Sequence, residues 1–185
     1  NFEFEIITSF SMTAPISEEQ FLETPESELT YNLYDALLKH YQEKTELNAQ
    51  MAFPVIKDVY ERPGNKFERI VVPFTDGVKS LNVVTNLKEA YESKGKHLIE
   101  DFERNITLAI IDEAWKDHLR KMDELKQSVQ LAVHEQKDPL LIYKFEAFEL
   151  FKNMLSQLNK EVLSFLIKGS LPSQSPSSIQ EAKKT

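Results

Sequence analysis

The sequence predicts a mainly α-helical protein: a long antiparallel two-helix hairpin together with a small helical domain that carries one β-hairpin. The first observation is that apolar residues recur at helical spacing through two long segments, which only the short stretch 130–137 separates. The second is a tight-turn signal between two β-rich runs near residue 76. The third is size, because 185 residues with 41% apolar content and 12 Phe are enough to bury a core. We therefore expect a folded, soluble protein.

Helix-start signals mark the first part of the chain, residues 1–98, which we assign to the small helical domain. Ser17 and Gln20 have the spacing of a capping box, in which each side chain satisfies a backbone N–H at the start of a helix. Pro25 suits the first position of a further helix, which has an apolar residue every four positions. Pro54 is expected to end or kink that helix, because proline has no N–H for the helical hydrogen bond.

A β pattern replaces the helical one at about 66–85. Two runs rich in β-branched and aromatic residues flank the segment Thr75-Asp76-Gly77, which favours a tight hairpin turn. Pro73 lies in the first run and cannot donate a hydrogen bond to a neighbouring strand, so we expect it at a sheet edge. The prediction is a single β-hairpin within the helical domain.

Two long helices are expected after the hairpin, at about 87–131 and 139–168. Asp138 is suited to cap the second helix, with Pro139 in its first turn. Gly169 is suited to end that helix.

Neither long helix can bury its apolar stripe alone, so we expect the two to pack against each other as an antiparallel hairpin, residues 99–168. The stripe positions lie three or four residues apart on each helix. The expected core of the hairpin is Trp115, Leu119, Met122, Phe148 and Phe151. The remaining segment, 169–185, is rich in Ser and Pro and is expected to be a disordered linker or tail.

The composition argues against several classes of function. The net charge is −8, with 30 acidic against 22 basic residues, so a nucleic-acid binder with a cationic face is not expected. The absence of Cys excludes disulfides, thiolate zinc sites and a cysteine nucleophile. No apolar run approaches the roughly 20 residues that cross a bilayer. The chain begins without Met and has no basic leader, so we expect it to be a piece of a longer protein.

Nucleotide and metal sites are not predicted in this chain. Its four glycines form neither a GxxxxGK[ST] nor a GxGxxG loop, so we expect no ATP binding by these residues alone. His97 and Glu100 are three positions apart but in the reverse order of the helical di-metal motif, and the pattern occurs once. The four histidines are scattered along the chain: His40, His97, His118 and His134. We therefore expect no metal cofactor.

An acid–base enzyme is a further possibility, because Asp112, Asp117 and His118 lie close together in the sequence. On a helix, however, Asp112 and Lys116 are neighbours, whereas Asp117 and His118 point in different directions. A solvated charged face beside a buried Trp is the favoured interpretation. An enzyme would require activity of this chain that is lost on His118→Ala.

The connection between the long helices, residues 130–138, is a candidate binding site. It lies at the end of a rigid support and carries polar residues. Function concentrates on such loops, but most turns only connect two elements. The residues alone leave both interpretations open.

Several short motifs follow one another between residues 106 and 155. These motifs are Asp112 followed by Trp115, Asp117-His118-Leu119, Met122-Asp123-Glu124-Leu125, Gln136-Lys137-Asp138-Pro139, and Tyr143-Lys144 before a Phe-rich helix. In their order and spacing they resemble the two-helix finger of the SecA family, the ATP-driven motors of bacterial protein export. Together they cover about a third of the chain.

The resemblance implies a division of labour within a longer protein. The residues before the finger would form the helical wing domain, and the finger would belong to the helical scaffold domain. ATP and Mg²⁺ would bind in motor domains that precede this segment, and the family's C-terminal zinc module needs cysteines, which this chain lacks. The β-hairpin looks like an insertion relative to the family's shorter wing.

The resemblance also implies a site and partners. The finger tip would contact the SecYEG channel and the unfolded preprotein, and the finger would restrain the protein's own motor domains when idle. His134 occupies the place of the family's tip tyrosine, and keeps a flat ring with hydrogen-bonding ability. The tip residues implied are Val133, His134, Glu135, Gln136, Lys137 and Asp138. The location implied is the cytoplasmic face of the bacterial inner membrane, with the membrane reached only through the channel and no nucleic acid involved.

A coiled-coil adaptor that binds a partner helix along its stripe is the alternative from a different class of function. If both stripes are satisfied within one chain, the protein should be monomeric. An obligate helical dimer would favour the adaptor.

Overall fold

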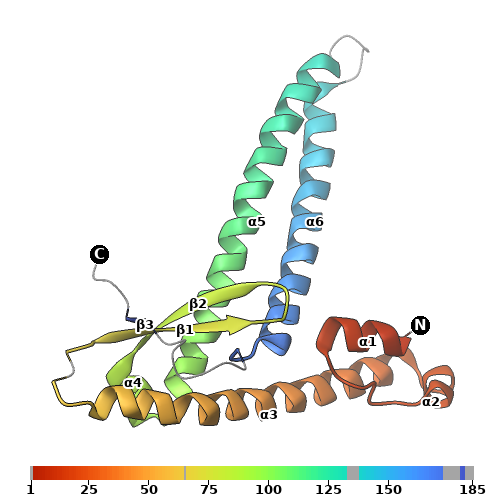
Figure 1. The fold of residues 1–185 in the computed structure, drawn as a ribbon. Coiled ribbons are helices and arrows are strands. Elements are labelled where there is room, and N and C mark those ends of the chain that lie inside the picture. Colours follow the sequence, from red (N-terminus) through yellow and green to blue (C-terminus); the bar gives the residue numbers. More distant parts are fainter. Residues whose placement is uncertain (1, 65, 133–137, 173–179, 182–185) are drawn as a thin grey trace. The chain divides into compact units, whose positions relative to one another are not determined.

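The computed structural model describes residues 2–64, 66–132, 138–172 and 180–181. The described chain is mainly helical with one small antiparallel sheet, as Figure 1 shows, which confirms the predicted fold class. It divides into two compact units. The first unit comprises Asn1–Ile106 and Ser164–Thr185, and the second unit comprises Thr107–Leu163. The first turns of one long helix and the last turn of the other therefore belong to the first unit.

Three helices open the first unit: α1 (Phe2–Phe10), α2 (Glu18–Glu23) and α3 (Glu26–Glu61). The predicted capping box is present at α2: the Ser17 backbone N–H donates to Gln20 Oε1 at 3.0 Å, and Gln20 N–H donates to Ser17 Oγ at 3.3 Å. Of the two outcomes expected at Pro54, an end or a kink of the helix, the end does not occur, since α3 continues through Pro54 to Glu61. Pro54 is exposed, so water can satisfy the carbonyl that loses its partner.

The predicted β-hairpin is formed by β1 (Arg69–Thr75) and β2 (Ser80–Asn86). Its turn is fixed by Asp76, whose Oδ1 accepts hydrogen bonds from the N–H of Val78 at 2.9 Å and of Lys79 at 2.7 Å. Gly77 has a φ of 92°, a conformation that glycine adopts without strain. The tight turn predicted at Thr75-Asp76-Gly77 is therefore confirmed.

The other edge of β1 is covered by the chain's own C-terminal part. Thr75 and Ser170 exchange two backbone hydrogen bonds of 2.9 Å, and β3 (Gln180–Glu181) pairs with β1 at Val71 and its neighbour. The strand order is β2-β1-β3, so the expectation that Pro73 lies at a sheet edge is wrong. Alternate residues of a strand face the same side, so the missing N–H of Pro73 is on the side of β3 and Ser170. The expectation of disorder after residue 168 needs correction at these paired positions.

The long helix expected from residue 87 is two helices, α4 (Leu87–Glu92) and α5 (Lys96–Ala132). Gly95 separates them with a φ of 91°, and a Cβ at this position would lie 2.6 Å from the Ala49 carbonyl oxygen. The break therefore reflects a left-handed residue pressed against α3, which a helical periodicity cannot reveal.

The core of the first unit lies between one face of the hairpin and the start of α5. The Phe102 ring is central, with its centroid 4.3 Å from that of Phe74 and 6.3 Å from that of Phe165. The other fully or almost fully buried apolar residues here are Ala52, Ile56, Ile70, Val72, Val83, Leu87, Ala90, Leu98 and Ile106.

The second unit is the antiparallel pair formed by the rest of α5 and by α6 (Pro139–Lys168), which Figure 1 shows as two long helices side by side. Among the described residues, no helix is both long and apolar enough to cross a membrane.

Candidate functional site

In the sequence, the candidate tip, residues 133–138, connects the two helices of the second unit. Val133, His134, Glu135, Gln136 and Lys137 are outside the described residues. Asp138 is described and performs the predicted capping role, because its Oδ1 accepts hydrogen bonds from Leu140 N–H at 2.9 Å and Leu141 N–H at 3.4 Å. The structure therefore supports a defined helix start directly after the tip.

The seam between the two helices of this unit uses buried and half-buried residues at helical spacing. On α5 these are Ile110, Ala114, His118, Met122, Leu125 and Val129. On α6 they are Tyr143, Ala147, Leu150, Met154, Leu158 and Val162. Apolar side chains of several sizes form most of this seam, from Ala114 and Ala147 to Met122 and Leu150.

Most of the residues expected to form the core of this hairpin are at its surface. The exposed fractions are 47% for Trp115, 49% for Leu119, 62% for Phe148 and 40% for Phe151, whereas Met122 is half-buried. The expectation of a buried core at the four exposed positions is therefore wrong for this unit. Both helices have apolar residues on two adjacent arcs, and only the structure shows that the smaller residues form the seam.

These exposed residues, with Ile111, Phe145 and Leu155, make up what we call the aromatic face of the second unit. Monomeric proteins seldom expose so many large apolar side chains along one pair of helices. The aromatic face is therefore a candidate contact surface, additional to the tip, that sequence reasoning assigned to the core.

His118 lies at the border of the seam and the aromatic face. Its side chain is 7% exposed, and its ring centroid is 5.5 Å from that of Trp115 and 5.8 Å from that of Phe151. Nδ1 of His118 has no hydrogen-bond partner in the part of the chain that the structure describes. The imidazole thus serves here as an aromatic packing residue.

The acidic residues near His118 are engaged elsewhere. Asp112 accepts from Lys116 at 2.6 Å, and Asp117 pairs with Lys121 at 2.7 Å and with Arg120. The hydrogen bond from Lys121 and the charges of both cations lower the pKa of Asp117. These exposed pairs are the solvated charged face that the sequence favoured, and they give no acid–base arrangement with His118.

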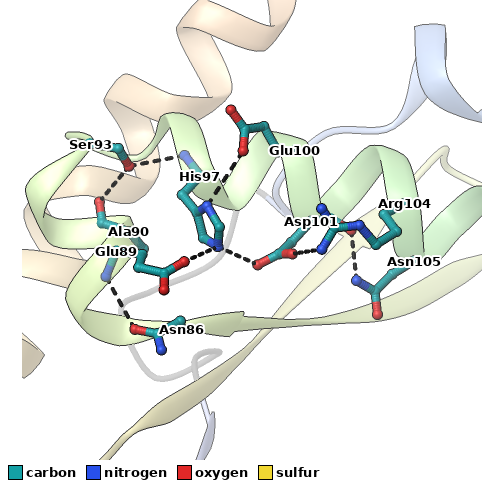
Figure 2. A network of polar contacts seen from close by, with 9 residues as sticks. All are labelled: Asn86, Glu89, Ala90, Ser93, His97, Glu100, Asp101, Arg104 and Asn105. Atoms are coloured by element: carbon teal, nitrogen blue, oxygen red, sulfur yellow. Dashed lines mark hydrogen bonds and ion pairs between the residues drawn. The ribbon is translucent and has the colours of Figure 1, made fainter.

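His97 is surrounded by carboxylates at the start of α5, as Figure 2 shows. Its Nε2 lies 2.9 Å from Glu89 Oε2 and 3.3 Å from Asp101 Oδ2, and its Nδ1 lies 3.4 Å from Glu100 Oε2. The geometry of these groups does not suit a metal ion, and no metal-binding group of three or more side chains occurs among the described residues. The network instead connects α4 to the first turns of α5.

Comparison with known proteins identifies the family. The SecA Wing and Scaffold domain matches residues 3–170, almost the whole chain. The chain belongs to this family. The first unit, with α1–α4 and the sheet, and the second unit, with the helix pair, both lie almost wholly inside the matched range.

Curated relatives give the same result. The protein translocase subunit SecA of Flavobacterium psychrophilum is 66% identical over 98% of this chain, and that of Christiangramia forsetii is 65% identical over all of it. The SecA of Bacteroides fragilis is 44% identical over 97% of the chain. The chain spans 16% of the length of each of these relatives. No solved structure matches it.

The β-hairpin, which looks like an insertion in the sequence, is inside the range matched by these relatives. The alignments with Flavobacterium and Christiangramia SecA cover 182 and 185 residues of the chain, so they include the hairpin. The sequence that forms the hairpin therefore lies within the region that aligns with these relatives.

Proposed function

We propose that this chain is the non-catalytic translocation and regulatory segment of a SecA-type, ATP-driven preprotein translocase. The observation that carries the proposal is the match of nearly the whole chain to the SecA Wing and Scaffold domain. The finger motifs at residues 112–125 and at Tyr143-Lys144 lie on the two helices of the second unit. ATP hydrolysis belongs to motor domains elsewhere in the full-length protein, and this segment transmits motion rather than performing chemistry.

The proposed partners are the SecYEG channel and the unfolded preprotein, which the finger contacts through its tip, residues 133–138. Two stiff helices with a capped start at Asp138 form a suitable support for such a contact. Extended polypeptide would be engaged through its backbone and apolar side chains, without a sequence preference. The site of action is the cytoplasmic face of the bacterial inner membrane, reached through the channel.

The aromatic face supports a place inside a larger assembly. Its side chains are exposed in a chain that spans only 16% of its relatives' length, so a surface of the remaining protein is available to cover them. Through this contact, a movement of the finger would be passed to the motor domains. Restraint of an idle motor by the finger requires such a contact.

A shortened finger tests the proposal. The rings of His118 and Phe151 lie 5.8 Å apart, so replacing residues 122–150 with a short glycine-rich turn joins the helices just beyond this pair and keeps the base intact. In the full-length protein we expect loss of ATP-driven preprotein transport with nucleotide binding retained. Preserved transport would contradict the proposal.

The adaptor remains a second candidate because the aromatic face is free to accept a partner helix. The same shortened variant separates the two functions. If the chain is an adaptor, transport by the full-length protein should continue in this variant, and the partner helix should stay bound to the residues of the aromatic face that remain, Ile111, Trp115, Leu119, Phe151 and Leu155.

A further inference from the structure

The C-terminal end of α6 is capped by side chains of α3 within the first unit. The Ile167 carbonyl accepts a hydrogen bond of 2.5 Å from Lys44 Nζ, and the Gly169 carbonyl accepts one of 3.2 Å from Asn48 Nδ2. The last carbonyls of a helix have no donor within the helix, so they need partners from outside it. Two residues of α3, one turn apart, supply these partners.

The residues around this cap are packed on several sides. Asn48 is 3% exposed, and a Cβ on Gly169 would lie 2.7 Å from Phe102 Cζ. The next residue, Ser170, exchanges its two hydrogen bonds with Thr75 of β1. The segment 167–170 is therefore held by α3, α5 and β1, and we call it the α6 anchor.

Lys44 is well suited to this position electrostatically. Its ammonium lies at the negative end of the α6 dipole, where a cation is stabilised. Half-burial lowers the pKa of Lys44 to about 8, so most of this side chain is still protonated at pH 7 and can donate to the carbonyl as a cation. Asn48 is neutral and buried. Its side-chain amide donates its hydrogen bond to the Gly169 carbonyl, and a buried amide without such a partner is destabilising.

The same face of α3 also contacts the start of α5. Tyr41 donates a hydrogen bond of 2.7 Å to Glu103, and the Ala49 carbonyl is the surface against which Gly95 is pressed. The α3 face thus touches the ends of both helices that continue into the second unit. The contacts to α5 are supported by a buried core around Phe102. At the α6 anchor, the two side-chain hydrogen bonds from α3 add to the packing against Phe102 and to the backbone hydrogen bonds with Thr75.

We propose that Lys44 and Asn48 are positioning residues, which fix the axial position of α6 and pass a load carried along this helix into α3. The inference rests on the proposed function, in which the helix pair transmits motion. It follows from the geometry of α6, a single 30-residue helix with Pro only at its first position and no Gly, so that force at one end reaches the other. The α6 anchor is where that helix ends.

The test uses the full-length protein with Lys44→Met, which keeps the aliphatic stem, and separately Asn48→Ala. Matched controls on the same helix are Lys57→Met and Gln50→Ala, at exposed positions. Amide exchange in the last turn of α6 should accelerate by roughly ten- to a hundredfold in both anchor variants, the equilibrium effect of losing such a hydrogen bond. The controls should exchange like the parent.

The functional readout is the amount of preprotein transported per ATP hydrolysed, measured on the same preparations. This ratio should fall in Lys44→Met and Asn48→Ala, stay at the parental value in both controls, and recover in Lys44→Arg, which keeps the cation and a donor. A general loss of folded protein would lower transport and hydrolysis together and leave the ratio unchanged.

Two outcomes overturn the inference: an unchanged ratio in both anchor variants, or no recovery with arginine. Neither outcome touches the proposed function, which falls only if the protein with the shortened finger still transports. If the protein with the shortened finger does not transport and the anchor variants behave like Lys57→Met, this inference alone is refuted.

Discussion

The helix α5 shows two different environments along its length. In the first unit its residues Leu98, Phe102 and Ile106 are almost completely buried. In the second unit four apolar residues of the same helix are 41–59% exposed: Leu108, Ile111, Trp115 and Leu119. The helix is apolar in both stretches, so the difference lies in whether this chain supplies the covering residues.

This contrast separates what the chain stabilises by itself from what it offers to other surfaces. The first unit has a closed core around Phe102, with helix ends capped from α3. The second unit has a narrow seam and leaves its aromatic face uncovered. The first prediction below compares the closed core with the aromatic face, and the next two compare matched residues within one unit.

The largest difference is expected between two phenylalanines. Phe102→Ala should lower the free energy of unfolding by about 3–5 kcal/mol, because it opens a cavity in a closed core. Phe148→Ala, on the aromatic face, should change it by less than about 1 kcal/mol. Urea denaturation of the chain followed by far-ultraviolet circular dichroism measures both. Equal losses would mean that the two environments do not differ as described.

A pair of glycines gives the next largest effect. Gly95 and Gly77 have φ values of 91° and 92°, so alanine introduces the same backbone strain, roughly 1 kcal/mol, at both. Only at Gly95 would the new Cβ also meet a backbone atom, the Ala49 carbonyl oxygen at 2.6 Å, whereas nothing lies within 4 Å at Gly77. Gly95→Ala should therefore cost about 1–3 kcal/mol more than Gly77→Ala. The same denaturation experiment decides it, and equal costs would show that α3 gives way.

A smaller effect is expected where α6 begins. Asp138→Ala removes the acceptor for two backbone N–H groups and should cost about 1 kcal/mol. Asp112→Ala removes one exposed ion pair with Lys116 and should cost less than about 0.5 kcal/mol. Thermal unfolding of the two variants side by side provides the comparison. A larger loss at Asp112 would contradict the assignment of Asp138 as the cap.

Much of this fold was predictable because its signals are local. The capping box at Ser17, the turn at Asp76-Gly77 and the cap at Asp138 each depend on side chains that bond to nearby backbone, so the sequence spacing determines the geometry. The motifs of the helix pair likewise predicted the family that the comparisons show.

The features that the sequence did not predict depend on contacts between residues far apart in the sequence. The break at Gly95 reflects contact with Ala49. The end of α6 at Lys168 was predicted, but its contacts with Lys44 and Asn48, which lie more than a hundred residues earlier, were not. The seam was missed for a related reason: with two apolar arcs on each helix, periodicity does not say which one meets the partner.

The smallest expected effect is a change in the fluorescence of Trp115, the single tryptophan of the chain, which reports on the aromatic face. It is exposed here, and the account predicts that it is covered in the full-length protein. Acrylamide should quench its fluorescence less in a full-length protein that has only this tryptophan than in the 185-residue chain. Equal quenching would mean that the aromatic face stays open in the intact protein.

We propose that the finger tip meets the moving polypeptide, and a single cysteine at the tip provides the test of this contact. The chain has no native cysteine, so His134→Cys in the full-length protein, with any cysteines elsewhere removed, places one reactive thiol at the tip. Lys160→Cys, at an exposed position far along α6, is the control. During ATP-driven transport of a stalled preprotein, the account predicts cross-links from position 134 to the preprotein and the channel, and none from position 160. No cross-link from position 134 in an active translocase would contradict it.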